Sequence, residues 1–320
     1  MSKVYLGFDT SNYSTSFAAV AEGGEVLANR KRFLSVKDGE RGLRQSDAVF
    51  QHVQNLSSVS DEIKSFKEEY PDSEVAGIGF SEKPRDLEGS YMPCFLVGKG
   101  LAVSAASLLS VPYYGFSHQA GHIAAALLGS GATGLLGKEF AAFHVSGGTT
   151  DVLYVTSSEC GDLITEPIGG TKDLNAGQVI DRAGVMMGLP FPSGKYIEQE
   201  ALKNEKPVPK YSQTVSGLFC NLSGIENKAS QLYAASGDVP LVSAFVLRAV
   251  SDTLEILTDR LISLKGSIPI VYSGGVMSCK RIKERLAGDG RYFADPEYSS
   301  DNAAGVAYLA MLKHISERTV

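Results

Sequence analysis

One order of strands and turns occurs twice along this 320-residue chain, and it constrains the fold more than any other feature. The predicted strands lie at 4–8, 16–20 and 25–27, and again at 140–145, 151–155 and 163–164. Each set is followed by a helical pattern, a buried strand and a second helix, which gives the order βββαβα twice. Such a duplication predicts two similar α/β lobes that face a cleft. A generic α/β chain with accidental similarity between its halves is the alternative.

The remaining periodicities place the helices and divide the chain. Helices are predicted at 43–66, 95–109, 174–187, 241–265 and 301–316, and further strands at 75–80, 113–114 and 268–272. We expect a first lobe at 1–116, completed by the C-terminal helix at about 301–320. The second lobe is then expected at 117–300.

Composition excludes several classes of protein. No stretch approaches about 18 apolar residues, and Asp9 interrupts the N-terminus before a signal sequence could form, so we expect a cytoplasmic protein without a membrane span. The four cysteines lie far apart, which predicts neither a disulfide framework nor a thiolate zinc site. The net charge is −6, from 30 basic and 36 acidic residues, which argues against a chain-wide nucleic-acid surface. Basic clusters at 30–32, 83–85 and 280–285 leave room for a local patch that binds a polyanion, or are ordinary solvated faces.

Glycine and hydroxyl residues gather in three turns that suit phosphate. Two of these turns, 9–12 and 146–150, occupy equivalent places in the duplicated pattern. The third, with Gly274 and Gly275, ends a buried strand, and Ser278 follows before a basic helix. Small residues leave backbone N–H groups free to bind an anion such as a phosphate. The alternative is that the two hairpins are ordinary turns, for which the same residue types are common.

Two histidines show the spacing of metal ligands. His118 and His122 are four residues apart, on one face of a predicted helix. The glutamate of a zinc-peptidase motif is missing, because Gln119 follows His118. Asp301, at the start of the last helix, could add an oxygen ligand, and such a site suits one divalent metal such as Zn, Fe, Mn or Mg. Histidines that cap or pack, and an aspartate that caps its helix, are the alternatives.

Several motifs resemble those of the TsaD family, formerly called Gcp or O-sialoglycoprotein endopeptidase, of the ASKHA (actin/sugar kinase/Hsp70) superfamily. The stretches that are similar to family motifs are 117–122 (HxxGH), 145–150 (VSGGHT), 176–182 (AGEAFDK), 189–194 (LxYPGG), 215–218 (FSGLK) and 300–304 (TDNAAM). The resemblance implies an ASKHA fold and a metal site of His118, His122 and Asp301. It also implies that Asp181 and Gly194 contact the nucleoside ribose. The other nucleotide-binding residues that we expect are Ser146, Gly147, Gly148, Thr149, Gly274, Gly275 and Ser278.

The resemblance also implies a reaction. Family members transfer a threonylcarbamoyl group from its adenylate to the adenosine beside a tRNA anticodon, with TsaB- and TsaE-like partners in bacteria. The related carbamoyltransferases HypF and TobZ use a similar site for carbamoyl-adenylate. We therefore expect ATP or an acyl-adenylate as the bound nucleotide. The expected partners are tRNA or another carbamoyl acceptor, and a TsaB- or TsaD-like protein or a second copy of the chain.

The chain also departs from the family pattern. Its first hairpin has Tyr13 and Ser14 where the family has two carboxylates, while Asp9 and Ser11 remain as the residues expected to be catalytic. Cys279 replaces an asparagine of the nucleoside pocket, and Thr149 replaces the histidine of the second hairpin. These changes predict a (threonyl)carbamoyltransferase-like enzyme with an altered acceptor. The alternative is a non-catalytic ATP-binding partner or regulator of a true transferase, and the missing glutamate counts against a metallopeptidase.

Overall fold

In the computed structural model, which describes residues 2–11, 14–35, 43–299 and 303–319, the chain divides into two units. The first unit comprises 1–138, 156–165 and 300–320, and the second comprises 139–155 and 166–299. The first unit thus includes 117–138, which the sequence placed in the second lobe. Packing explains this difference, because the helix that begins at His118 lies against the C-terminal helix.

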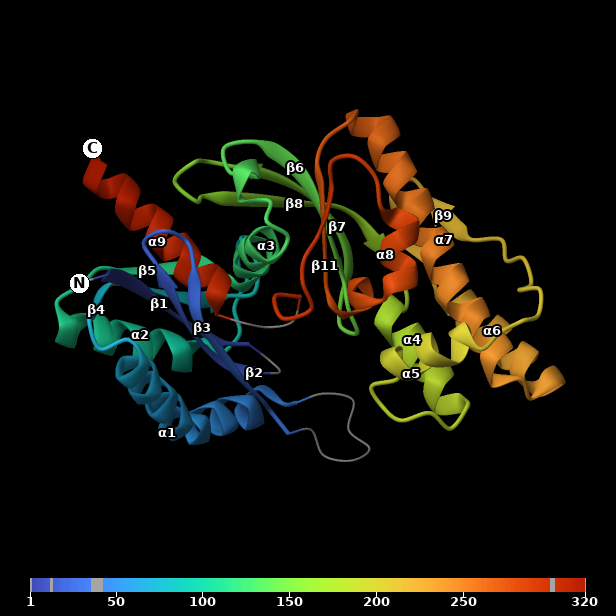
Figure 1. Cartoon of the computed structure of the whole chain (residues 1–320), viewed down its shortest axis with the longest axis horizontal. Helices are drawn as coiled ribbons and strands as arrows, with labels where there is room; N and C mark the ends of the chain where they lie inside the picture. Colours follow the sequence, from blue (N-terminus) through green and yellow to red (C-terminus); the bar gives the residue numbers. More distant parts are fainter. Residues whose placement is uncertain (1, 12–13, 36–42, 300–302, 320) are drawn as a thin grey trace. The chain divides into compact units, whose positions relative to one another are not determined.

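The first unit is built on a five-stranded sheet with the order β3-β2-β1-β4-β5 (Figure 1). Its strands are β1 (Ser2–Thr10), β2 (Ser14–Ala21), β3 (Val26–Phe33), β4 (Ser73–Lys83) and β5 (Tyr113–Ser117). Strand β2 is antiparallel to β1 and β3, whereas β4 is parallel to β1 and β5. The helices of this unit are α1 (Gln45–Glu69), α2 (Phe95–Leu109), α3 (His118–Gly129), the short η1 (Thr133–Leu135) and α9 (Ala304–Thr319).

Alternation along β1 divides its side chains between the two faces of this sheet. Leu6 and Phe8 belong to the apolar core that includes residues of α1 and α2. Gly7 faces α9 instead, where a Cβ would collide with the carbonyl oxygen of Ala303. Since successive residues of a strand point to opposite faces, Asp9 lies on the same face as Gly7.

Glycines allow α9 to approach its neighbours closely. A Cβ on Gly79 of β4 would collide with the carbonyl oxygen of Val306. A Cβ on Gly305 would collide with the carbonyl oxygen of Gly121, which lies between the two histidines of α3. The first turn of α9 is therefore held against β4 and against the histidine-bearing turn of α3.

The second unit is built on a seven-stranded sheet with the order β12-β11-β6-β7-β8-β10-β9. Its strands are β6 (Glu139–Val145), β7 (Thr150–Ser157), β8 (Leu163–Thr171), β9 (Thr214–Ser216), β10 (Phe219–Asn221), β11 (Ile270–Ser273) and β12 (Arg291–Phe293). Its helices are α4 (Ala176–Met186), α5 (Gly194–Leu202), α6 (Ser223–Ser236), α7 (Val239–Lys265), the short η2 (Gly275–Ser278) and α8 (Lys280–Leu286). The buried stripe of α7 contributes more residues than any other element to the core of this unit.

The two sheets confirm the predicted duplication. The order β8-β7-β6-β11-β12 in the second unit repeats the order β3-β2-β1-β4-β5 of the first. The second sheet is extended by β10 and β9 beyond β8, and these strands lie in an insertion between α5 and α6. The first unit has no counterpart of this insertion in its described residues.

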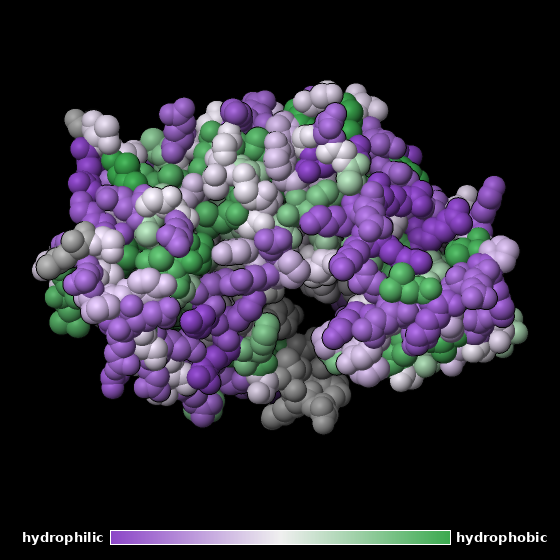
Figure 2. Space-filling model, in the orientation of Figure 1, coloured by the Kyte–Doolittle hydropathy of each residue, from purple (hydrophilic) through white to green (hydrophobic). Residues whose placement is uncertain are grey.

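None of the helices in the described parts of the chain is long and apolar enough to cross a bilayer. On the face drawn in Figure 2, hydrophilic residues cover much of the surface and hydrophobic areas lie scattered between them.

Candidate functional site

A pocket of about 650 Å³ lies within the second unit and collects many of the predicted nucleotide-binding residues. Its lining includes the predicted residues Gly147, Asp181, Gly194, Gly275 and Ser278. The lining also includes Gly177, Ile180, Phe191, Pro192, Lys195, Tyr196, Glu198, Leu247, Val276 and Cys279. A mainly apolar wall with a few convergent polar groups is typical of small-molecule sites.

The hairpin 146–150 forms one edge of this pocket through Gly147. The Ser146 hydroxyl accepts hydrogen bonds from the backbone N–H groups of Gly148 (3.2 Å) and Thr149 (3.1 Å), and the Ser146 N–H donates to the Thr149 carbonyl (2.7 Å). These two predicted phosphate-binding N–H groups are therefore bound within the hairpin itself. Of the described residues around the pocket, Ser146, Gly148 and Thr149 support the edge but do not line the cavity.

The N-terminus of helix α4 contacts the hairpin and holds it in place. The Thr150 hydroxyl accepts from the backbone N–H of Ala176 (2.9 Å), and the Gly177 N–H donates to the Ser146 carbonyl (3.1 Å). A Cβ on Gly177 would lie 2.6 Å from the Gly147 nitrogen, well inside contact distance. The glycine of the 176–182 motif thus allows a helix N-terminus to touch the hairpin, a role that the spacing alone did not predict.

Asp181, one helical turn along α4, presents its carboxylate to the pocket. The backbone N–H of Ser193 donates to Asp181 Oδ1 (2.7 Å), which fixes the carboxylate beside the turn that leads to Gly194. Burial raises the pKa of Asp181, and the hydrogen bond from Ser193 opposes that rise. A partly desolvated acceptor of this kind suits a hydroxyl or amine donor of a ligand.

Gly274 serves the pocket indirectly. It adopts a positive φ of 99°, and a Cβ there would collide with the carbonyl oxygen of Val145 at the end of β6. Only glycine tolerates both conditions. The next residues include Gly275, Val276 and Ser278, which line the pocket, although Gly274 itself does not.

Cys279 stands where the family pattern has an asparagine, and its thiol is engaged. It donates to Glu198 Oε1 (3.4 Å), which also accepts from the backbone N–H of Lys280 (2.7 Å) at the start of α8. Burial raises the pKa of Cys279 to about 11, so the thiol stays protonated near neutral pH. Glu198, which sequence reasoning missed, therefore joins α5 to α8 across the pocket wall.

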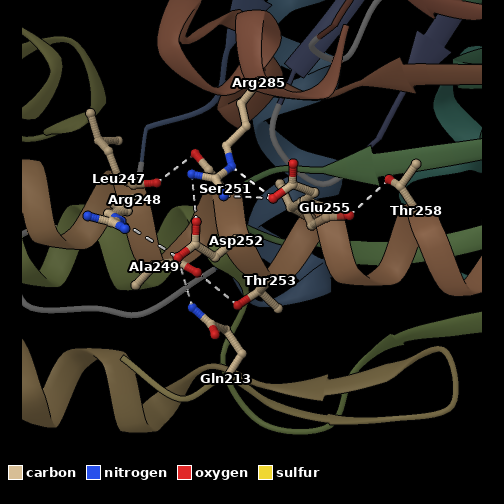
Figure 3. Close-up of polar contacts among 11 residues, drawn as sticks. Gln213, Leu247, Arg248, Ala249, Ser251, Asp252, Thr253, Glu255, Thr258 and Arg285 are labelled. Carbon is tan, nitrogen blue, oxygen red and sulfur yellow. Dashed lines mark hydrogen bonds and ion pairs between the residues drawn. The ribbon is translucent and has the colours of Figure 1, made fainter. Parts of the chain in front are cut away.

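Ion pairs hold α8 against α7 (Figure 3). Arg285 contacts Glu255 Oε2 through Nε (3.0 Å) and Nη2 (2.7 Å), and its Nη1 lies 2.8 Å from Asp252 Oδ1. Gln213 donates to the other oxygen of Asp252 (3.2 Å). Part of the basic run 280–285 is therefore neutralised within the protein, which favours the structural interpretation of Arg285 over a contact with nucleic acid.

The histidine pair lies in the first unit, at the start of α3. Ser117 caps this helix, because its hydroxyl accepts from the Ala120 N–H (3.1 Å) while donating to Asp86 Oδ2 (2.6 Å). The Nε2 atoms of His118 and His122 are 2.9 Å apart. Asp9 Oδ2 lies 2.7 Å from His118 Nδ1. The predicted residues Asp9, His118 and His122 are thus neighbours.

These residues fit part of a metal site. Two imidazole nitrogens converge, and the carboxylate of Asp9 is almost wholly buried, with no hydrogen-bond partner for Oδ1 among the described residues. Asp301, the expected third ligand, lies outside the described residues, and so does Tyr13. Within 2–11, 14–35, 43–299 and 303–319, no group of three or more His, Cys, Asp or Glu residues is arranged to hold a metal. The donor set fits a divalent metal only with a ligand from beyond these ranges.

A buried histidine that the sequence did not single out fixes the first hairpin. His52 of α1 is fully buried, and its Nε2 donates to the carbonyl of Ser11 (2.8 Å). Its Nδ1 therefore accepts from the hydroxyl of Thr15 (2.8 Å), which in turn accepts from Asn55 (3.0 Å). Burial lowers the pKa of His52. Ser11, a predicted catalytic residue, is itself buried and is tied through its backbone to α1.

Comparison with known proteins adds to this geometry. A sequence model of the TsaD family, described as tRNA N6-adenosine threonylcarbamoyltransferase, matches residues 27–308. A Methanopyrus kandleri protein named tRNA N6-adenosine threonylcarbamoyltransferase is 26% identical over 318 residues, covering 97% of this chain and 88% of that protein. A Methanocaldococcus jannaschii protein named probable bifunctional tRNA threonylcarbamoyladenosine biosynthesis protein is 26% identical over 321 residues. This chain covers 98% of its own length there but only 56% of that protein, so it spans about half of the bifunctional relative.

Solved structures share the fold. Component A of the (R)-2-hydroxyglutaryl-CoA dehydratase of Acidaminococcus fermentans aligns with a TM-score of 0.55 at 16% identity, over 98% of this chain and 99% of that one. Full-length HypF, in its phosphate- and nucleotide-bound form, aligns with a TM-score of 0.57 at 12% identity, over 98% of this chain and 55% of that one. At such identities the likeness shows the fold alone, and together with the match to the TsaD family model it confirms the predicted ASKHA fold.

Proposed function

Because the chain belongs to the TsaD family, we propose that it is a nucleotide- and metal-dependent transferase of carbamoyl or threonylcarbamoyl groups. The observation that carries the proposal is the pocket of the second unit, which brings together Gly147, Asp181, Gly194, Gly275 and Ser278 from separate motifs. Its volume of about 650 Å³ suits a nucleoside monophosphate with an attached acyl group.

In the proposed reaction, an amine of the acceptor attacks the carbonyl carbon of a carbamoyl- or threonylcarbamoyl-adenylate. A new C–N bond forms, the bond from carbon to the phosphate oxygen breaks, AMP leaves, and the amine loses one proton. The Asp181 carboxylate would accept from the ribose hydroxyls, and the hairpin at Gly147 would lie against the phosphate. The family resemblance also implies a divalent metal, for which His118, His122 and Asp301 would be the ligands and which would supply Lewis-acid chemistry.

The acceptor is the part of the proposal that departs from the relatives. Ser14, one of the two residues that replace the carboxylates of the first hairpin, is fully buried, and its hydroxyl lies 3.1 Å from that of Ser16. Neither Tyr13 nor Ser14 is acidic, so the first hairpin lacks the two carboxylates of the family pattern. We infer that tRNA adenosine or a related amine is the acceptor class, with the choice among them altered in this chain.

The test is transfer from preformed threonylcarbamoyl-adenylate to tRNA, read as AMP release and as modified nucleoside by mass spectrometry. Metal-loaded protein is expected to give product, and Asp181→Asn is expected to weaken adenylate binding about 10–100-fold, since a hydrogen bond to a charged group contributes about 1.5–3 kcal/mol. Asp289→Asn, which changes an exposed carboxylate outside the pocket lining, is the matched control and should behave as wild type. If the protein binds the adenylate but forms no product with any amine acceptor, the proposal that it is a transferase is refuted.

A non-catalytic nucleotide-binding partner is the second candidate. The replaced carboxylates at Tyr13 and Ser14 favour it, and so does the engagement of Asp9 with His118. It predicts that ATP binds with the same dependence on Asp181, that no acceptor is modified by this chain alone, and that adding it raises the turnover of a TsaD-type transferase. Turnover by the isolated chain would exclude this candidate.

A further inference from the structure

We propose that Asp9 is a positioning residue for the metal ligand His118, rather than a group that exchanges protons with the substrate. The inference rests on the proposed metal dependence, and it assigns a different role to a residue that the sequence indicated as catalytic. Its basis is the 2.7 Å contact between Asp9 Oδ2 and His118 Nδ1, together with the 2.9 Å approach of His118 Nε2 to His122 Nε2.

The contact with Asp9 determines which nitrogen of His118 carries the proton. An ionised carboxylate can only accept, so Nδ1 of His118 must be the donor. The proton of the neutral ring is then on Nδ1, and Nε2 presents its lone pair toward His122. At 2.9 Å there is room for only one proton between the two Nε2 atoms. A cation bound by both nitrogens would replace that single proton.

Asp9 is held firmly enough to impose this arrangement. It is 2% exposed and pairs with Ser16 in the β1–β2 ladder. The next residue, Thr10, is anchored to the start of α2, since its hydroxyl donates to the Cys94 carbonyl (2.9 Å) and accepts from the Gly98 N–H (3.0 Å). The carboxylate therefore approaches His118 from a strand end that is fixed on both sides.

The ring of His118 is confined in turn. It packs on Phe95 of α2, with ring centroids 5.7 Å apart, and on the ring of His122 at 4.3 Å. Carboxylates that accept from the remote nitrogen of a ligating histidine fix its orientation, and their loss typically weakens metal binding 10–100-fold. A buried carboxylate that is already committed to an imidazole is poorly placed to reach a tRNA amine as a general base.

The experiment measures metal affinity without nucleotide or acceptor, by titrating Co²⁺ into metal-free protein and following its visible absorption, then displacing it with Zn²⁺. Asp9→Ala is expected to weaken Co²⁺ binding 10–100-fold, and Asp9→Asn less, because the amide oxygen can still accept from Nδ1. Asp86→Asn is the matched control, since Asp86 bonds the Ser117 cap of the same helix but not the histidine. It should change the affinity by less than about threefold, so a loss shared by both variants would mean a general disturbance of α3 and would overturn the proposal.

A second measurement needs no metal. In metal-free protein, ¹⁵N chemical shifts of the histidine rings should show the proton of His118 on Nδ1 in wild type, and a shift of the population toward Nε2 in Asp9→Ala. Unchanged shifts, or unchanged Co²⁺ affinity in a folded Asp9→Ala protein, would overturn the role of Asp9 while leaving the transferase proposal intact. Conversely, if metal binding depends on Asp9 but the protein transfers no group, the proposed transferase function is refuted and the role of Asp9 stands.

Discussion

The contact between α4 and the phosphate hairpin makes Gly177→Ala the most informative single substitution in the second unit. A Cβ at this position would lie 2.6 Å from the Gly147 nitrogen and 2.7 Å from the Gly147 Cα, where ordinary contact begins near 3.4 Å. Because the nearest atoms are backbone, the hairpin must move by about 0.8 Å to restore contact distance. Overpacking of this size costs about 1–3 kcal/mol, against which alanine gains up to about 1 kcal/mol over glycine in a helix.

We therefore expect Gly177→Ala to lower the free energy of unfolding by about 1–2 kcal/mol, equivalent to a fall in Tm of about 2–8 °C. ATP or adenylate affinity, measured by calorimetric titration, should fall by at least tenfold, because displacement of the hairpin moves Gly147 at the pocket edge. Gly100→Ala, in the exposed middle of α2 with nothing within 4 Å of its Cβ, is the control and should be neutral or slightly stabilising. Nucleotide binding at wild-type strength in Gly177→Ala would refute the idea that this close approach shapes the pocket.

Three further outcomes test other parts of the structure. Burial lowers the pKa of His52 below its ordinary value of about 6.5, so the unfolded chain binds a proton at His52 at a higher pH than the folded chain does. The free energy of unfolding should therefore fall as the pH drops below about 6.5, by up to about 1.4 kcal/mol per pH unit. Urea unfolding from pH 7.5 to 5 should show this slope, and His52→Gln should lack it. Arg285→Ala removes the ion pairs that Arg285 makes in Figure 3 and should lower the free energy of unfolding by about 1 kcal/mol in low salt and by less in 1 M NaCl. Arg281→Ala, the control, should lower it by less than about 0.5 kcal/mol in the same urea unfolding experiment. Equal losses in both variants would contradict a structural role of Arg285. Since burial raises the pKa of Cys279 to about 11, mass-spectrometric alkylation of this thiol should be slow at pH 7.5 and rise steeply toward pH 10, and rapid labelling at pH 7.5 would show that the thiol is not buried as described.

The sequence predicted those parts of the fold that depend on local patterns. Apolar runs and turn residues located the strands of both sheets around the two hairpins, and the periodicity of α2 and α7 located these helices to within two residues at each end. The strands β9, β10 and β12 escaped prediction, because three residues carry no readable periodicity. The domain boundary also differed, since α3 joins the first unit through the contact of Gly121 with Gly305, which no local pattern reveals.

The candidate site divides in the same way. Gly275 could be predicted to line a nucleotide pocket because it follows a buried strand, and Asp181 because the stretch 176–182 resembles a motif of the family. The pairing of Asp9 with His118, the support of Ser11 by His52 and the link from Glu198 to Cys279 could not, since each joins residues of different elements. Burial and hydrogen-bond partners decide these roles, and both are properties of the tertiary structure.

The position of α9 in the first unit has a consequence for the order in which the protein is assembled on the ribosome. Domains usually fold in the order in which they are synthesised, N-terminal first. Here the second unit is complete once residue 299 has emerged, whereas β1 and β4 wait for 304–319 to cover Gly7 and Gly79. The unit that begins the chain is therefore the later one to mature, and until then one face of its sheet is open to chaperones or to misassociation with other nascent chains.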